Sequence, residues 1–128
     1  MNRTPDDLEL LAVRLGEAAL RDQPLGARTT YRVGGTAALA VEAEDEDALV
    51  AVSRALDGLD VPVLVVGNGS NLLVADRGLR GLAVFLGGAF SGLAIDGTDV
   101  RAGAALSLPA LARRTVSAGL HGLSLIHI

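Results

Sequence analysis

A strand, a helix and a second strand follow one another in residues 37–66, and this succession constrains the fold more than any other feature. An extended apolar run ends at Glu42, and a second one spans Val61–Val66. Between them, Glu44, Asp45 and Glu46 place negative charge where a helix dipole favours it. The helical face is then apolar, at Leu49, Val52 and Leu56. The pattern predicts a βαβ unit with parallel strands.

Two further helices are expected. The first begins with Thr4 as N-cap and Pro5 at the first helical position. Its apolar face is predicted at Leu8, Leu11, Ala12, Leu15 and Ala19. Residues 23–28 interrupt this spacing and are interpreted as a connector. The last helix opens at Ser107 and closes at Gly119, with an inward face at Leu108, Leu111, Ala112 and Val116.

Short strands are expected between residue 72 and the last helix. They are predicted at Leu72–Val74 and Leu82–Leu86, separated by a turn. A hairpin is predicted over residues 93–102, because Asp96-Gly97 lies between two alternating runs. The whole pattern predicts an α+β chain, in which a βαβ unit is followed by short strands and a helix.

Charge and composition limit the classes of partner. The net charge is −4, and the aromatic residues are one Tyr and two Phe. Both facts argue against nucleic-acid binding, which uses basic surfaces and aromatic stacking. No apolar run reaches the roughly 18 residues that a membrane span needs, and residues 1–7 do not resemble a secretory signal. The sequence predicts a cytoplasmic protein with no membrane partner.

One loop carries most of the chemical information. The strand ending at Val66 runs directly into Gly67-Asn68-Gly69-Ser70-Asn71. Glycines without Cβ atoms allow successive backbone N–H groups to converge on an anion, and Ser and Asn side chains can add donors. Because the loop contains no charged residue, it suits a pyrophosphate that stays bound in a cofactor.

The loop also has a simpler interpretation. Asn-Gly and Gly-Ser are common turn dipeptides. The segment is not a Rossmann fingerprint, because the third glycine is missing and a strand is expected to follow. It is not a P-loop either, because no Gly-Lys-Ser/Thr is present.

Several segments together resemble the UDP-N-acetylenolpyruvoylglucosamine reductase family, also called UDP-N-acetylmuramate dehydrogenase. They lie in the same order and at similar spacing between about Thr29 and Leu123. These segments are Thr30-Tyr31-Arg32-Val33-Gly34-Gly35, Pro62 to Val74 with its Gly-Asn-Gly-Ser-Asn-Leu stretch, Asp76, Gly78 and Gly81, Ala102-Gly103-Ala104, and Ala118 to Leu123.

The resemblance implies a fold, a cofactor and a reaction. The fold is the FAD-binding domain of the vanillyl-alcohol-oxidase type (PCMH-like), here truncated. Family members use NADPH and FAD to reduce UDP-GlcNAc-enolpyruvate to UDP-N-acetylmuramate for peptidoglycan synthesis. The resemblance assigns cofactor binding to Gly67, Asn68, Gly69, Ser70, Asn71 and Leu72. Residues 102–104 are expected to approach the cofactor, which should be held non-covalently, because the chain has no Cys and no His near the loop.

The chain also departs from the family pattern. The family's catalytic Arg, its proton-donating Ser and an assisting Glu all come later and have no counterpart here, so no catalytic residue is predicted. Residues 124–128 do not continue the pattern and are interpreted as a non-native tail. The expected organisation is an N-terminal helix and connector (1–28), a partial FAD-binding domain (29–123) and the tail (124–128).

Two alternatives stay open. The chain could belong to another oxidase or dehydrogenase that shares this FAD domain, or it could be a small non-enzymatic module that binds a nucleotide or anion. Individual residues do not decide between them. His121 and His127 are isolated, no metal site is predicted, and Tyr31 and Arg32 are interpreted as sheet-edge residues that lie near the flavin position.

Overall fold

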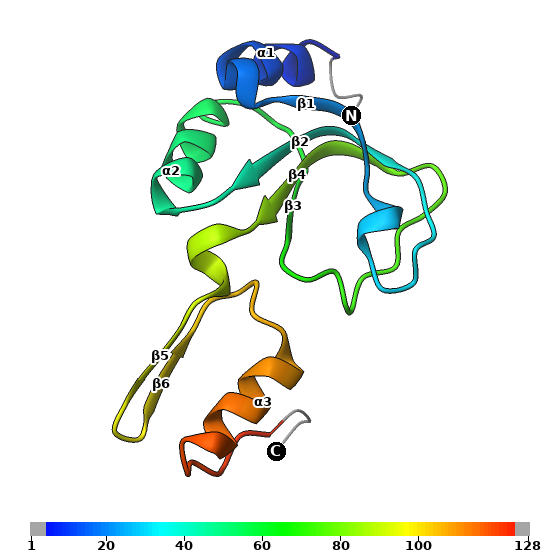
Figure 1. Cartoon of the computed structure of the whole chain (residues 1–128). Coiled ribbons are helices and arrows are strands. Elements are labelled where there is room, and N and C mark those ends of the chain that lie inside the picture. The colour runs from blue at the N-terminus through cyan, green and yellow to red at the C-terminus, as the bar shows by residue number, and fades with distance from the viewer. Residues whose placement is uncertain (1–4, 125–128) are drawn as a thin grey trace.

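A four-stranded mixed sheet forms the centre of the protein (Figure 1). The structure is a computed structural model, which describes residues 5–124. The strands lie in the order β1-β2-β4-β3, and β1 is antiparallel to β2, whereas β2, β4 and β3 are parallel. Their bounds are Leu20–Pro24 for β1, Thr36–Ala43 for β2, Val63–Val66 for β3 and Leu79–Leu86 for β4. The mixed sheet with helices confirms the predicted α+β class.

One face of the sheet is covered by α1 (Pro5–Leu15) and α2 (Glu46–Ala55). The strand side chains on this face form one core with side chains of both helices. This core contains Leu11, Ala12, Leu39, Val41, Ala43, Val52, Ala55, Leu82 and Val84. The Asp45 carboxylate caps α2 by accepting from the Ala48 N–H at 2.9 Å. The βαβ prediction is confirmed, since α2 joins the parallel strands β2 and β3, and β4 lies between these strands.

Loops rather than helices cover the opposite face. Its core contains Leu25, Ala37, Ala40, Val66, Val74, Ala83 and Phe85. A short 3₁₀ turn, η2 (Gly26–Arg28), follows β1 and lies over this face. Because the covering is made of loops, backbone groups of several segments come together here.

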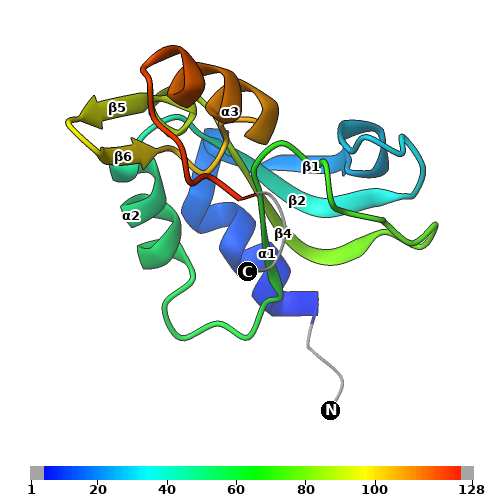
Figure 2. The same ribbon diagram turned by 90° about the horizontal axis from the view of Figure 1, so that it is seen from below.

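The C-terminal part projects away from the sheet (Figure 1), and Figure 2 shows the protein from below. It contains a 3₁₀ turn, η3 (Gly88–Ser91), the hairpin strands β5 (Leu93–Asp96) and β6 (Asp99–Ala102), and α3 (Leu108–Ser117). The predicted hairpin is confirmed, and its two-residue turn is Gly97-Thr98. α3 lies beside the hairpin in both views.

The N-terminal helix differs in length from the prediction. It ends at Leu15, where a 3₁₀ turn, η1 (Gly16–Ala18), takes over. Leu11 and Ala12 are buried as expected. The predicted cap, Thr4, lies outside the described residues. α1 packs in the same core as the later elements, and β1 belongs to the same sheet.

Three expectations were wrong. The connector at 23–28 overlaps strand β1, which pairs with β2 at the edge of the sheet. Residues 72–74 are not a strand, because they pass over the sheet without a partner strand. In α3 the expected inward residues Leu108 and Val116 are exposed at 53% and 71%, whereas Thr115 is buried.

Within residues 5–124, no helix has the length and apolar character needed to cross a membrane.

Candidate functional site

The predicted phosphate loop begins at the carboxyl edge of the parallel strands. Val66, the last residue of β3, pairs with Phe85 in β4, and Phe85 pairs in turn with Glu42 in β2. The next residue is Gly67, so the loop leaves the sheet where three parallel strands end. Open sheets with parallel strands commonly bind ligands outside these carboxyl ends.

Four consecutive backbone donors of the loop are free. Among residues 5–124, the N–H groups from Asn68 to Arg77 donate to no backbone or side-chain acceptor, and the first four of them belong to the loop. Free N–H groups in a glycine-containing turn are the donors that bind phosphate oxygens in proteins. The loop therefore retains unused capacity to donate to an anion.

The side chains of the loop divide into two groups. Asn68, Ser70 and Asn71 are exposed, and their polar atoms have no hydrogen-bond partner in the described part of the chain. Leu72 is half-buried and packs against the loop-covered core, together with the buried Val74. Leu72 therefore anchors the end of the loop while the three polar side chains face solvent.

Gly67 allows a close backbone approach. A Cβ atom at this position would lie 2.6 Å from the carbonyl oxygen of Ala104. The segment from Ala102 to Ala104 is itself held in place, because the Gly103 N–H donates to the Gly92 carbonyl at 2.9 Å. The segment that was expected to approach the cofactor thus lies directly beside the loop.

Gly69 is held by the turn that follows β1. Its φ is +65°, and a Cβ atom would lie 2.5 Å from the Arg28 carbonyl oxygen and 3.2 Å from the Thr29 Cα. The Gly69 carbonyl accepts a hydrogen bond from the Thr30 N–H at 3.0 Å. Glycine is required here because the chain packs against itself, a reason that the sequence alone did not reveal.

Thr29 organises the turn that holds Gly69. It is 4% exposed, and its hydroxyl donates to the Gly26 carbonyl at 2.7 Å and accepts from the Arg32 N–H at 3.2 Å. Tyr31 and Arg32 follow in the turn, so their interpretation as sheet-edge residues was wrong. Both are exposed, and Arg32 has a left-handed φ of +55°.

Arg28 is a residue that the sequence analysis missed. Its guanidinium carbon lies 3.6 Å from the centroid of the Phe85 ring, and the guanidinium forms an ion pair with Glu42. Nothing in the local sequence signals this contact, because the partners lie on two different strands. Arg28 places a positive charge on the turn that holds a loop without charges.

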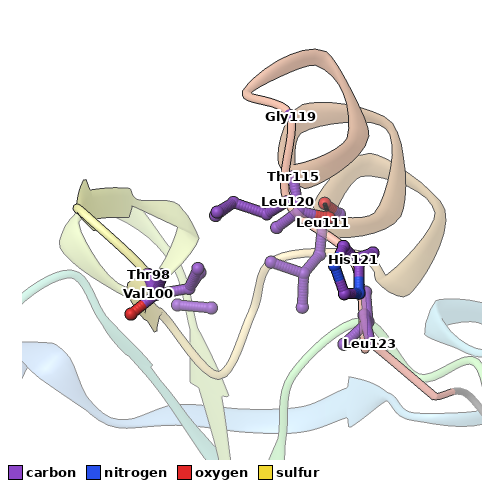
Figure 3. Close-up of a pocket in the computed structure, with 9 residues that line it drawn as sticks. Thr98, Val100, Leu111, Thr115, Gly119, Leu120, His121 and Leu123 are labelled. Atoms are coloured by element: carbon purple, nitrogen blue, oxygen red, sulfur yellow. Dashed lines mark hydrogen bonds between the residues drawn. The ribbon is translucent and has the colours of Figure 1, made fainter.

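A cavity of about 460 Å³ lies between the hairpin and α3 (Figure 3). Its lining residues are Thr98, Val100, Ala102, Leu111, Thr115, Gly119, Leu120, His121 and Leu123. His121 lines the cavity together with Leu111 and Leu123. The Thr115 hydroxyl already donates to carbonyls of its own helix, so the lining offers few free polar groups.

Metal-binding clusters are absent from the part of the chain that the structure describes, where no three His, Cys, Asp or Glu side chains come together. His127 lies outside the described residues. Cofactor binding by residues Gly67 to Leu72 remains a prediction. The geometry of the loop specifies which of its donors are free to bind a phosphate.

Comparison with known proteins identifies the wider group. A family described as an FAD binding domain matches residues 37–124, which include the loop, the hairpin and α3. The chain belongs to this FAD-binding domain family. The match begins in β2, so the turn that holds Gly69 precedes the matched part of this FAD-binding domain.

Related sequences agree with the resemblance found from the motifs. The chain is 43% identical over 104 residues to UDP-N-acetylenolpyruvoylglucosamine reductase from Heliobacterium modesticaldum, and the match covers 81% of this chain and 33% of that protein. It is 48% identical over 99 residues to the reductase of the same name from Dinoroseobacter shibae, covering 77% and 32%. The resemblance is therefore confirmed.

A solved structure agrees with the fold. The crystal structure of UDP-N-acetylenolpyruvylglucosamine reductase from Thermus caldophilus matches this chain with a TM-score of 0.62 and 36% identity. The match covers 81% of this chain and 35% of that one. The chain thus spans about a third of the length of the relatives that it matches.

Proposed function

We propose that this chain supplies the pyrophosphate-binding part of the FAD site in an NADPH-dependent UDP-N-acetylenolpyruvoylglucosamine reductase. The main support is the place of the glycine-containing loop, whose N–H groups from Asn68 to Asn71 are free, directly after the carboxyl end of β3. The exposed side chains of Asn68, Ser70 and Asn71 add further donors beside them. Residues 29–123 form the flavin-binding part in this proposal, and the preceding residues add helix α1 and strand β1.

The loop fits a pyrophosphate on chemical grounds. A pyrophosphate offers only acceptor oxygens, and the loop offers N–H, hydroxyl and amide donors. No carboxylate lies in the loop, since the next acidic residue along the chain is Asp76. FAD bound here would carry hydride between NADPH and the enolpyruvyl group of the substrate. The chain's own residues bind the cofactor's phosphates and fix its position.

Relatives support the reductase over the two alternatives. The proteins that the chain matches at 43% and 48% identity both carry the reductase name. The alternatives are another oxidase with the same domain and a non-enzymatic anion-binding module. Neither of these two relatives carries such a name. The family's catalytic groups have no counterpart in the chain, so the proposal assigns it cofactor binding and no catalytic residue.

Flavin titration tests the proposal most directly. The intact protein that the gene encodes is freed of flavin and titrated with FAD while flavin fluorescence is followed. Gly69→Val should weaken FAD binding more than Asn68→Ala, because a β-branched residue is strained at positive φ and displaces the turn at Arg28. Equal affinities in both variants and the parent would show that the loop does not bind the cofactor. Thermal melting of each flavin-free variant separates weakened binding from lost folding.

Two further measurements test the finer statements. Acid precipitation of the yellow protein should release the flavin into the supernatant, because FAD is held non-covalently. Flavin that stays with the pellet contradicts this. The purified 128-residue chain should not oxidise NADPH in the presence of UDP-GlcNAc-enolpyruvate, and substrate-dependent turnover by this chain would refute the assignment of catalysis to residues outside it.

A further inference from the structure

We propose that Arg28 is the positioning residue of the FAD phosphate loop, which it fastens to the ends of β2 and β4. The inference rests on the proposed function, because it concerns how the loop is held ready for a pyrophosphate. Arg28 lies outside the segment that matches the FAD-binding family, which begins at residue 37. Its role follows from contacts of both its backbone and its side chain.

The backbone of Arg28 meets the loop at Gly69. The space beside the Gly69 Cα is filled by the Arg28 carbonyl oxygen, which would lie 2.5 Å from a Cβ atom there. Two residues further on, the Thr30 N–H donates to the Gly69 carbonyl at 3.0 Å. The turn therefore determines both the position and the left-handed conformation of Gly69.

The side chain of Arg28 returns to the sheet. Its guanidinium stacks on Phe85, 3.6 Å from the ring centroid, and donates to both carboxylate oxygens of Glu42. Glu42 and Phe85 are paired residues of adjacent strands. A planar guanidinium can stack on a ring and pair bidentately at the same time, which a lysine cannot do.

These contacts form a closed circuit around the loop. Phe85 pairs with Val66, the residue that precedes Gly67. Arg28 thus connects the strand that begins the loop to Gly69, three residues after Val66. Without this connection the turn is still closed by Thr29, but it loses its attachment to the carboxyl ends of the strands. The free N–H groups of residues 68–71 then no longer hold one fixed arrangement.

A comparison of FAD with riboflavin separates a positioning role of Arg28 from a general effect on stability. A loop that contacts only the phosphates should change the affinity for FAD. Riboflavin has no phosphate, so its affinity should not depend on the loop. Arg28→Met keeps the aliphatic stem and removes the guanidinium. Glu42→Gln keeps Arg28 and weakens its ion pair, so it provides a milder variant. Arg21→Met is the matched control, because Arg21 forms a similar paired contact with Glu9, at 2.8 and 3.0 Å, elsewhere on the surface.

The experiment measures dissociation constants for FAD and riboflavin in the intact protein that the gene encodes, together with thermal melting of the flavin-free form. Arg28→Met should weaken FAD binding about tenfold, which corresponds to about 1.4 kcal/mol, and should change riboflavin binding less than about twofold, about 0.4 kcal/mol. Glu42→Gln should shift FAD binding in the same direction by a smaller factor. Arg21→Met should change neither ligand.

Each outcome decides the matter. Unchanged FAD binding in Arg28→Met, or an equal loss for FAD and riboflavin, overturns the positioning role. If FAD binding responds to Gly69→Val but not to Arg28→Met or Glu42→Gln, only this proposal fails and the proposed function stands. If the parent protein does not bind FAD, the proposed function fails and this proposal fails with it.

Discussion

Replacing Gly69 with alanine tests whether the chain's own packing, and not only the ligand, requires glycine in the loop. Gly69 has a φ of +65°, and its missing Cβ would lie 2.5 Å from the Arg28 carbonyl oxygen. Gly58 offers a matched position, because its φ is +72° and no atom lies within 4 Å of its missing Cβ. The two sites share a backbone conformation and differ in crowding.

The expected magnitudes follow from that difference. An alanine in the left-handed region costs about 1–2 kcal/mol at either site. At Gly69 the methyl group must also displace the turn at Arg28, and overpacking of this kind costs about 1–3 kcal/mol more. We therefore expect Gly69→Ala to lower the free energy of unfolding by about 2–5 kcal/mol, and Gly58→Ala to lower it by about 1–2 kcal/mol.

Urea unfolding of the flavin-free protein, followed by circular dichroism, measures both values. The comparison uses the difference between the two variants, so effects of a Gly→Ala change on the unfolded chain largely cancel. If Gly69→Ala costs no more than Gly58→Ala, the turn does not hold Gly69 tightly, and the packing argument is refuted. The proposed positioning role of Arg28 would then lose the support of its backbone contact with Gly69.

Three other predictions concern single side chains. Ser70→Ala should weaken FAD binding by about 1–3 kcal/mol if its hydroxyl meets a phosphate oxygen, and an unchanged titration would exclude that contact. Arg14→Met should lower the free energy of unfolding by about 1 kcal/mol, because the Arg14 guanidinium donates to two carbonyls at the end of α2, at 3.1 and 2.7 Å; an unchanged urea midpoint would contradict this. The hydrogen bond from Arg21 holds the pKa of Glu9 below its ordinary value, so the pair stabilises the fold above that ordinary value and loses its effect as the pH falls through the lowered pKa. Glu9→Gln should therefore be less stable than the parent near neutral pH and equal to it in strong acid, and a constant difference across the pH range would show that the pair does not titrate in this way.

Elements with a strong local pattern could be predicted from the sequence. The helix α2 has acidic residues and a capping Asp45 at its start, and its apolar spacing identifies the buried Val52. The hairpin has its turn residues between two alternating runs. In these cases the residues that determine the structure are neighbours in the chain.

Strands at the edge of the sheet could not be predicted in the same way. β1 contains Arg21, Asp22 and Gln23, and it becomes a strand because β2 offers a free edge. The apolar residues 72–74 show the opposite case. Leu72 and Val74 pack against the sheet, yet no strand is free to pair with them. Pairing depends on a partner distant in sequence, so local composition was misleading at both sites.

The candidate site was only partly visible in the sequence. The glycines and polar residues of the loop could be found from their types and their place after a strand. The contacts of Gly69 with Arg28 and Thr30, and of Gly67 with Ala104, join segments about 40 residues apart in sequence. Such contacts arise from tertiary structure, and a single sequence contains no signal for them.

The separate hairpin has a consequence for hydrogen exchange. β5 and β6 form their own sheet and have no buried residues, whereas β2 and β4 lie at the centre of both cores. Amide protons of β2 and β4 should exchange only when the whole domain unfolds, while those of the hairpin exchange by local opening. Ala104, two residues after the end of β6, lies against Gly67 of the loop. A ligand that immobilises the loop should therefore also slow amide exchange in β6.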